Sequence, residues 1–252
     1  MTRRGDDHAA IVAGAAHETE SGAPTVRDGD PTRAALSEAL RQEYGLLATM
    51  LASVWSASLV RVSLFLGVVS AIGVGLGFAA QAGDRSGGTF TVFALVALPL
   101  ALFLGLGTFV RTLELQREAF VYITGMNRIR HAIAEAVPAT RPYLVLSIHD
   151  DAAGVYRSQG TGIRLHPPRY RLAFALVQTQ GIVGVICGAL AGIFAGLATS
   201  AVSSALAWVA GLVASIVVVV GLLAFWTRSF AQIEAAVHPL FPTPPEELDR
   251  PI

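Results

Sequence analysis

Four stretches of the chain contain no charged residue, and each is about as long as a helix that crosses a membrane. They cover residues 62–82, 90–110, 172–197 and 205–226. Roughly 20 apolar residues in a helix span the hydrocarbon core of a bilayer. Uncharged runs of this length with short polar gaps between them are rare in soluble proteins. The sequence therefore predicts an all-α polytopic membrane protein, with four transmembrane helices in two hairpins plus cytoplasmic amphipathic helices.

Composition agrees with a membrane protein and gives no support for a nucleic-acid partner. Of 252 residues, 53% are hydrophobic and 14% are charged, whereas about 25% are charged in soluble domains. The formal net charge is zero, so bulk electrostatics favour no polyanionic partner. All basic residues are arginine, which indicates a high-GC, actinomycete-like source. The single cysteine, Cys187, lies mid-span and is expected to be a packing residue.

Composition also divides the chain into five segments. The first lacks the apolar core of a signal peptide and is typical of a disordered tail. Prolines 239, 242 and 245 could stack on one side of a polyproline II helix as a ligand for a recognition domain, but a solvated extended tail is favoured. The segments are a disordered cytoplasmic tail (1–33), an amphipathic helix with hairpin 1 (34–110), a cytoplasmic connector with an amphipathic helix (111–171), hairpin 2 (172–226) and a Pro-rich cytoplasmic tail (227–252).

The distribution of arginine predicts the orientation in the membrane. The turns inside the two hairpins hold only Arg85, which Asp84 offsets, whereas ten arginines lie near the opposite span ends. Basic residues stay on the cytoplasmic side. We therefore expect a multi-pass protein of the bacterial cytoplasmic membrane with both termini and the connector in the cytoplasm. Arg128, Arg169 and Arg171 are candidates for contact with lipid headgroups.

Two amphipathic helices are predicted outside the spans. One covers residues 31–60 and either runs along the inner membrane surface or continues into span one; the other follows span two and ends at Pro138. Residues 143–148 are expected to form a short strand or an apolar helix. Pro99, in the middle of span two, should kink that helix because it removes one backbone donor.

Small residues recur every fourth position in the spans, which predicts close helix packing. Span three carries the strictest series, and backbones approach closely along such a groove. Packing within one four-helix bundle is the favoured interpretation, and homo-oligomerisation, including around a pore, is the alternative. The candidate packing residues are Gly184, Gly188, Gly192 and Gly196 in span three, Gly67 and Gly75 in span one, Gly105 in span two and Gly211 in span four.

The sequence contains no recognisable catalytic, cofactor-binding or metal-binding motif. The spans lack the acidic, basic or histidine residues that ion-coupled transporters need. Residues 178–180 (Gln-Thr-Gln) are expected to form an interhelical hydrogen bond, with a polar vestibule as the alternative. His149, Asp150 and Asp151 could hold a cation, but a turn with an Asx-type hydrogen bond is favoured. We expect no enzyme activity, no cofactor and no metal.

Several segments resemble a group of uncharacterised actinobacterial four-span integral membrane proteins. The resemblance rests on Glu114-Leu-Gln-Arg-Glu118, on Met126-Asn-Arg-Ile-Arg-His131 within residues 121–131, on residues 142–145 and on residues 149–154. It implies a membrane location and no particular activity. The order of spans and amphipathic helices also resembles that of SLATT proteins, which are proposed pore-forming effectors.

The expected function is that of a non-enzymatic membrane protein. The first hypothesis is a structural or interaction scaffold packed through its small-residue stripes, with the lipid bilayer and an unknown protein as partners. The second is an oligomeric pore or channel, in which a homo-oligomer forms. Nucleic acid is not an expected partner.

Overall fold

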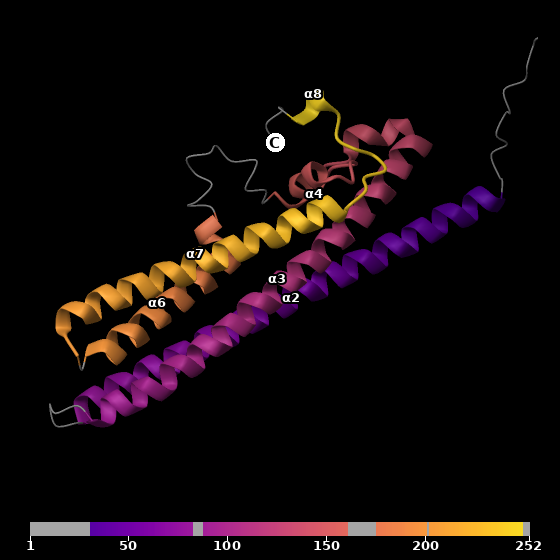
Figure 1. The fold of residues 1–252 in the computed structure, drawn as a ribbon. Helices are drawn as coiled ribbons and strands as arrows, with labels where there is room; N and C mark the ends of the chain where they lie inside the picture. The colour runs from indigo at the N-terminus through magenta and orange to yellow at the C-terminus, as the bar shows by residue number, and fades with distance from the viewer. Residues whose placement is uncertain (1–30, 83–87, 161–174, 201, 249–252) are drawn as a thin grey trace, which may run out of the picture. The chain divides into compact units, whose positions relative to one another are not determined.

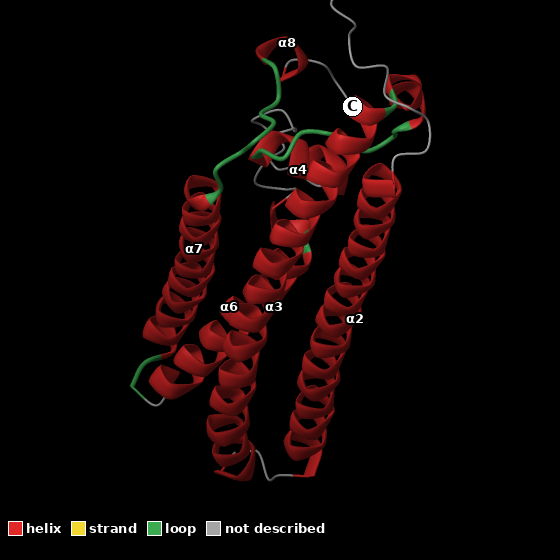
Figure 2. Cartoon of the chain, turned by 90° about the vertical axis from the view of Figure 1, so that its right-hand side faces the viewer, coloured by secondary structure: helices red, strands yellow, loops and turns green. Residues whose placement is uncertain are grey.

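The computed structural model describes residues 31–82, 88–160, 175–200 and 202–248, which form helices and loops and contain no strand (Figures 1 and 2). Four helices are long and apolar enough to cross a membrane. The predicted all-α fold with four candidate spans in two hairpins is confirmed. The helices are α2 (Pro31–Ala82), α3 (Gly88–Ala136), η1 (Pro138–Tyr143), α4 (Ala152–Gln159), α6 (Thr179–Ser200), α7 (Ser204–Ala236) and α8 (Pro245–Leu248).

Residues 1–42 and residues 43–252 form two units. In the first unit, the described residues are the start of α2, where Glu38 accepts hydrogen bonds from Arg41 and Gln42 one turn further on. Such pairs stabilise an exposed helix by roughly 0.2–0.5 kcal/mol each. Contacts along a single helix face therefore support this first part of α2.

Both predicted amphipathic helices are continuous with a span. α2 is one continuous helix from residue 31 to residue 82. Of the two alternatives for the first amphipathic helix, the structure therefore shows the one in which it continues into span one. α3 has 49 residues and contains Pro99 in its interior. At about 1.5 Å per residue such a helix is roughly 73 Å long, more than twice the ~30 Å core of a bilayer. Since α3 is so long, its second half must extend beyond the hydrocarbon.

The start of the third span is interrupted in its described part. α6 begins at Thr179, and the chain bends at Gln178 after the helical residues 175–177. A Cβ atom on Gly181 would lie 2.1 Å from the carbonyl oxygen of Ala175. Only glycine fits at position 181, because any larger residue would collide with this backbone. The predicted third span (172–197) is therefore helical in its described part except at residue 178, and residues 172–174 lie outside the described ranges.

α6 and α7 pack closely, because glycines on both helices let the two backbones approach each other. A Cβ on Gly192 would lie 2.8 Å from the carbonyl oxygen of Gly211, and one on Gly211 would lie 2.9 Å from that of Gly192. Ser203 precedes α7, which continues for 33 residues to Ala236. α7 therefore continues as one helix beyond the fourth uncharged stretch (205–226).

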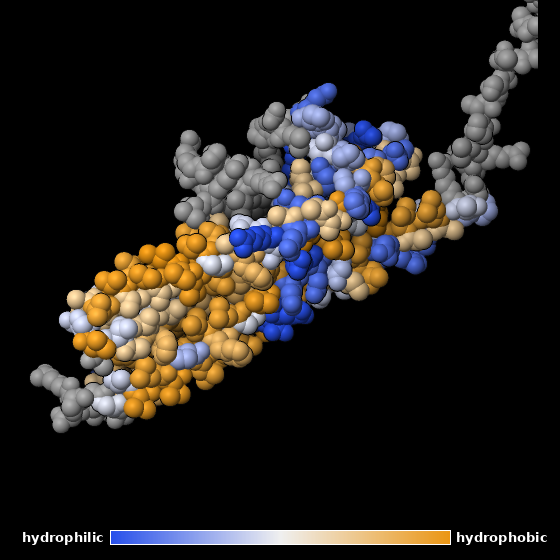
Figure 3. Space-filling view, in the orientation of Figure 1, coloured by the Kyte–Doolittle hydropathy of each residue, from blue (hydrophilic) through white to orange (hydrophobic). Residues whose placement is uncertain are grey.

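The apolar core between the helices is small, and most of the apolar surface faces outward. Phe65 of α2, Leu98 and Phe109 of α3, and Val183 and Cys187 of α6 belong to one buried cluster. Large side chains elsewhere on the four helices are exposed, and orange hydrophobic atoms cover much of the long helices in Figure 3. A soluble monomer rarely exposes so large an apolar patch. This surface therefore fits a lipid environment.

Candidate functional site

The polar ends of α3 and α7, together with η1, α4 and the segment after α7, form a region that we call the head (residues 111–160 and 228–248). At its centre is the carboxylate of Asp150, which is fully buried. It accepts hydrogen bonds from Arg128 Nε (2.7 Å), from the Leu240 N–H (2.9 Å) and from the Phe241 N–H (2.7 Å). Arg128 also donates to the carbonyl of His238 at 3.2 Å. Asp150 therefore joins the segment after α7 to α3 within the head.

The hydrogen bonds at Asp150 also determine its charge. Burial alone would raise the pKa of this carboxyl group, but the Leu240 N–H, Arg128 and the Phe241 N–H all favour the ionised form. Their combined effect lowers the pKa of Asp150 below its ordinary value of 3.8. The carboxylate is therefore ionised at neutral pH.

Asp151 binds the same C-terminal segment and also begins α4. Its Oδ2 accepts from the Thr243 N–H at 3.1 Å, and its Oδ1 accepts from the Thr243 hydroxyl at 2.6 Å. Oδ1 also accepts from the Gly154 N–H at 2.9 Å, which makes Asp151 the N-cap of α4. The expected Asx-type hydrogen bond is confirmed. The expected solvated tail after α7 was wrong for residues 240–243, because their backbone groups bind these two aspartates.

Asn127 of α3 binds α4 and the loop before it inside the head. Its side chain is fully buried; Nδ2 donates to the His149 carbonyl at 2.7 Å, and Oδ1 accepts from Arg130 at 2.6 Å and from Ser158 at 3.0 Å. Arg130 in turn donates to the Tyr44 hydroxyl of α2 at 2.9 Å. A chain of polar contacts thus joins α2, α3 and α4.

The residues considered as a cation site bind protein groups instead. His149 Nε2 lies 3.2 Å from Glu247 of α8, and both aspartates accept hydrogen bonds from the C-terminal segment. In the part of the chain that the structure describes, no three histidine, cysteine or acidic residues are grouped as metal ligands. Residues 143–148, expected as a strand or an apolar helix, contain only the end of η1 and a loop.

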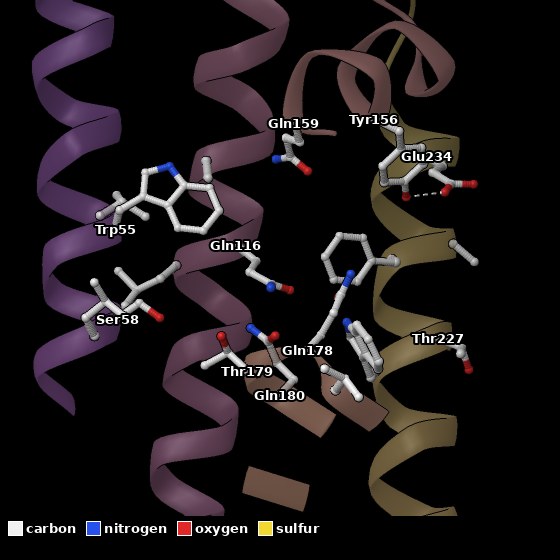
Figure 4. Close-up of a pocket in the computed structure, with 18 residues that line it drawn as sticks. Trp55, Ser58, Gln116, Tyr156, Gln159, Gln178, Thr179, Gln180, Thr227 and Glu234 are labelled. Carbon is white, nitrogen blue, oxygen red and sulfur yellow. Dashed lines mark hydrogen bonds between the residues drawn. The ribbon is translucent and has the colours of Figure 1, made fainter. Parts of the chain in front are cut away.

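A cavity of about 450 Å³ lies where the head meets the apolar parts of the helices. Its walls come from α2, α3, α4, α7 and the first turn of α6, and Figure 4 shows side chains from these elements around one space. At one wall the Tyr156 hydroxyl donates to Glu234 at 2.6 Å. Gln178, Thr179 and Gln180 all line the cavity. The predicted Gln-Thr-Gln cluster therefore borders a partly polar chamber.

The expected interhelical hydrogen bond of this cluster is confirmed at Gln180. Its Nε2 donates to the Thr112 carbonyl of α3 at 3.4 Å, and the side chain is almost completely buried. Its Oε1 atom, the Gln116 Oε1 atom and the Trp226 Nε1 atom are buried and have no hydrogen-bond partner among the described residues. All three residues line the cavity. Hydropathy did not indicate that these three residues line one cavity, because they belong to three different helices.

The candidate packing glycines differ in what surrounds them. In α6, Gly188, Gly192 and Gly196 face backbone atoms of α7, while Gly184 lies in ordinary contact distance of the Phe109 ring. The remaining candidates lie on the other three helices. Gly211 faces Gly192, Gly75 faces Phe93, and Gly105 faces Cys187 and Phe65. A Cβ atom added to Gly67 would have nothing within 4 Å.

The structure places one of the three candidate headgroup arginines. Arg128 binds Asp150 and the His238 carbonyl, so its guanidinium is engaged within the head rather than directed to lipid. Arg169 and Arg171 lie outside the described residues. Comparison of the chain with protein-family models, curated proteins and solved structures gives no match.

Proposed function

We propose that the protein is a non-enzymatic scaffold of the bacterial cytoplasmic membrane, whose four spans hold a folded interaction head in the cytoplasm. The observation that carries this proposal is the attachment of residues 240–243 to Asp150 and Asp151. It supports a fixed head surface, because the buried carboxylate of Asp150 and the partly buried carboxylate of Asp151 bind two parts of the chain that are distant in sequence. The positive-inside pattern of the arginines supports the cytoplasmic side.

Exposed apolar residues on this head support a protein partner. Val145 is 95% exposed and Tyr143 is 82% exposed, and both lie in or next to a loop rather than on a span. Leu240, which is 64% exposed, belongs to the segment that Asp150 fastens. Contiguous apolar patches mark interaction sites, whereas single exposed apolar residues are common, and we propose that these three side chains form one such patch. The partner we propose is a protein that covers these side chains.

Val145→Asp should release this partner without unfolding the head, because the side chain is almost fully exposed. In mild detergent extracts of the native membrane, the wild-type protein should migrate as a complex larger than the purified chain. The variant should migrate at the mass of the purified chain. Val202→Asp is the matched control, since Val202 is also an exposed valine, 79% accessible, but lies in the turn between α6 and α7.

An unchanged complex in the Val145→Asp variant would contradict the proposed interaction surface. Ion conductance of the purified protein in liposomes, with an oligomeric mass, would instead favour the pore alternative. Gly192 packs against Gly211 inside one chain, so this part of the glycine groove of α6 is already filled by α7. It is therefore not open to a neighbouring subunit, which supports the scaffold rather than the oligomeric pore.

Cysteine labelling in whole cells should establish the orientation. A membrane-impermeant maleimide should label Val202→Cys from outside, and it should label Tyr143→Cys only after lysis. Both positions are exposed, and the native Cys187 is fully buried and should stay unlabelled. Labelling of Tyr143→Cys in intact cells would reverse the proposed topology.

A further inference from the structure

Three buried polar atoms on residues that line the cavity lack a hydrogen-bond partner among the described residues: Gln180 Oε1, Gln116 Oε1 and Trp226 Nε1. Gln180 is 1% exposed and Trp226 is 5% exposed, so both side chains are more than nine-tenths buried. The Thr112 carbonyl can only accept, so Gln180 directs Nε2 toward Thr112 and keeps Oε1 for another partner. Burying a polar group without a partner is costly. These three atoms therefore indicate that the cavity holds polar groups.

The three atoms limit which groups can bind, because the two glutamine oxygens only accept and the indole N–H of Trp226 only donates. A carboxylate or a phosphodiester only accepts, so it leaves both glutamine oxygens without a donor. An ammonium group only donates and leaves Trp226 without an acceptor, and a single hydroxyl has one proton for two glutamine oxygens. Glu234 sets no requirement, since it binds the Tyr156 hydroxyl and has a further interaction within the chain. The bound group must therefore supply at least two donors and one acceptor.

Two neighbouring hydroxyl groups meet this requirement. Each hydroxyl donates one hydrogen bond and can accept others. One can donate to Gln180 Oε1 and the other to Gln116 Oε1, while either oxygen accepts from Trp226 Nε1. In Figure 4 the side chains of Gln116 and Gln180 reach toward the same space. The unpartnered atoms therefore fit a diol or a larger polyol.

The rest of the wall favours a polyol over a primary carboxamide, which has the same number of donors and acceptors. Aromatic rings of Trp55, Tyr156 and Phe230 line the cavity. The negative face of an aromatic ring attracts the C–H groups of a sugar ring. The hydroxyl-bearing residues Ser58 of α2 and Thr179 of α6 line it too. A sugar ring carries hydroxyl groups around its whole edge and can meet several walls, whereas a carboxamide is small and planar.

The cavity adjoins both the apolar surface and the head. Leu59 of α2 and Val177 line it, yet they are 65% and 73% exposed, so this edge belongs to the surface that fits lipid. Tyr156 and Gln159 of α4 bound it on the side of the head. A hydroxyl-rich group can therefore enter as the headgroup of a lipid or as a free molecule from water.

From the hydrogen-bond pattern and the composition of the wall, we propose that the cavity binds a sugar-type polyol, carried by a glycolipid or present as a free sugar. Two neighbouring hydroxyls bind Gln180 and Gln116, and one of their oxygens accepts from Trp226. The volume of about 450 Å³ lies in the range of roughly 300–1,000 Å³ of small-molecule sites. This site is separate from the proposed protein-binding surface at Val145 and does not depend on the scaffold function.

Fluorescence of Trp226 tests the proposal. The full-length chain carrying Trp55→Phe and Trp208→Phe keeps Trp226 as its single tryptophan and retains an aromatic ring at position 55. It is placed in phosphatidylcholine nanodiscs. The lipid probes are glucosyl, galactosyl and mannosyl diacylglycerols with brominated acyl chains, and the soluble probes are free glucose, galactose and mannose. At least one of the six should change the emission of Trp226 saturably.

The two sets of probes distinguish the source of the sugar. Saturable quenching by a glycolipid at a few per cent of total lipid, without a response to the same sugar in free form, assigns a lipid headgroup. A saturable response to a free sugar at millimolar concentration, which also relieves quenching by the glycolipid, assigns a soluble sugar. Brominated diacylglycerol and brominated phosphatidylcholine should quench weakly and without saturation in either case.

Glutamine variants provide the matched comparison. Gln180→Leu should raise the midpoint for the sugar probe about tenfold, as expected for the loss of one hydrogen bond to a buried group. Gln116→Leu should do the same, and it removes an oxygen that has no partner among the described residues, so folding should be preserved. Gln81→Leu should leave the midpoint unchanged. Gln81 is exposed on α2 and, like Gln180, donates to a backbone carbonyl, that of Gly77 at 3.2 Å.

Four results would overturn the proposal. No saturable response to any of the six sugar probes would mean that water satisfies the polar atoms. Equal quenching by glycolipid, diacylglycerol and phosphatidylcholine would mean that Trp226 meets bulk lipid. A saturable response to propionamide but not to sugars would mean a carboxamide ligand. Unchanged midpoints in both Gln180→Leu and Gln116→Leu would mean that the sugar binds elsewhere.

Discussion

Gly192→Leu should separate α6 from α7 and destabilise the protein by about 3 kcal/mol, the upper part of the range for overpacked sites. The first atom of the new side chain would meet the Gly211 carbonyl at 2.8 Å, and Ser215 Cβ would lie at 3.1 Å. A backbone carbonyl inside a helix cannot rotate away, so the two helices must move apart. In lipid, this close packing is a main source of helix association and is not replaced by a general hydrophobic effect.

The measurement is the midpoint of SDS-induced unfolding in mixed micelles, followed by the fluorescence of Trp226, which is 5% exposed. Gly221→Leu is the matched control, because Gly221 lies on α7 with nothing within 4 Å of the added carbon. The control should unfold within about 0.5 kcal/mol of the wild type, as is usual for exposed sites. An unchanged midpoint for Gly192→Leu, together with a smaller particle mass, would show that the glycine stripe packs between chains.

The sequence was sufficient to predict the four apolar helices, because their signal is local. Twenty or more uncharged residues must satisfy their own backbone groups in lipid, and a helix does this within one segment. The ends of the helices were predicted less well. Gln178 interrupts the third span because Gly181 allows a close backbone contact with Ala175, and nothing in hydropathy distinguishes this glycine from the others in the span.

The head could not be predicted from local patterns. The hydrogen bonds of Asp150 to Leu240 and Phe241 connect residues 90 and 91 positions apart. Prolines in the segment after α7 favour extended backbone, and extended backbone exposes the N–H groups that a carboxylate can bind. The sequence thus predicted an extended segment after α7 and an Asx-type hydrogen bond among residues 149–151, but not that these two parts of the chain bind each other.

The same limit applies to the cavity. Gln180 was recognisable as a polar residue inside a span, where such residues form interhelical hydrogen bonds. Gln116, in contrast, lies in the polar half of α3, and Trp226 is the last residue of the fourth uncharged stretch. Only the fold brings their unpartnered atoms around one space. Function in this protein is therefore better sought in the region where the spans enter the head than in any one span.

Asp150→Asn should release the segment after α7 from the head. The amide keeps the size of the side chain, but it loses the charge that pairs with Arg128 and directs an NH₂ group toward the backbone N–H groups of Leu240 or Phe241. A hydrogen bond to a charged group contributes about 1.5–3 kcal/mol. We expect a loss of about 3 kcal/mol in the stability of the attached segment. Glu246→Gln, an equal change of charge on the exposed side of α8, should have little effect.

Hydrogen exchange followed by mass spectrometry measures this release. The backbone N–H groups of Leu240 and Phe241 donate to Asp150 and that of Thr243 donates to Asp151, so these amides should exchange faster when the segment detaches. Peptides covering residues 238–244 should exchange at least tenfold faster in Asp150→Asn than in the wild type. Peptides from the middle of α3 should be unchanged. Equal protection of residues 238–244 in both proteins would show that other contacts hold the segment.

Acid should reproduce the effect of the variant in the wild-type protein. The pKa of Asp150 is lower in the folded protein than its ordinary value of 3.8, so the unfolded chain binds the proton more readily. The contribution of Asp150 to stability is therefore complete above that ordinary value and is lost as the pH falls through the lower, folded pKa. Protection of residues 238–244, corrected for the intrinsic exchange rate, should persist at pH 5 and fall only below about pH 3.8. In Asp150→Asn this step should be absent, and a wild-type step centred well above pH 3.8 would assign the attachment to a group other than Asp150.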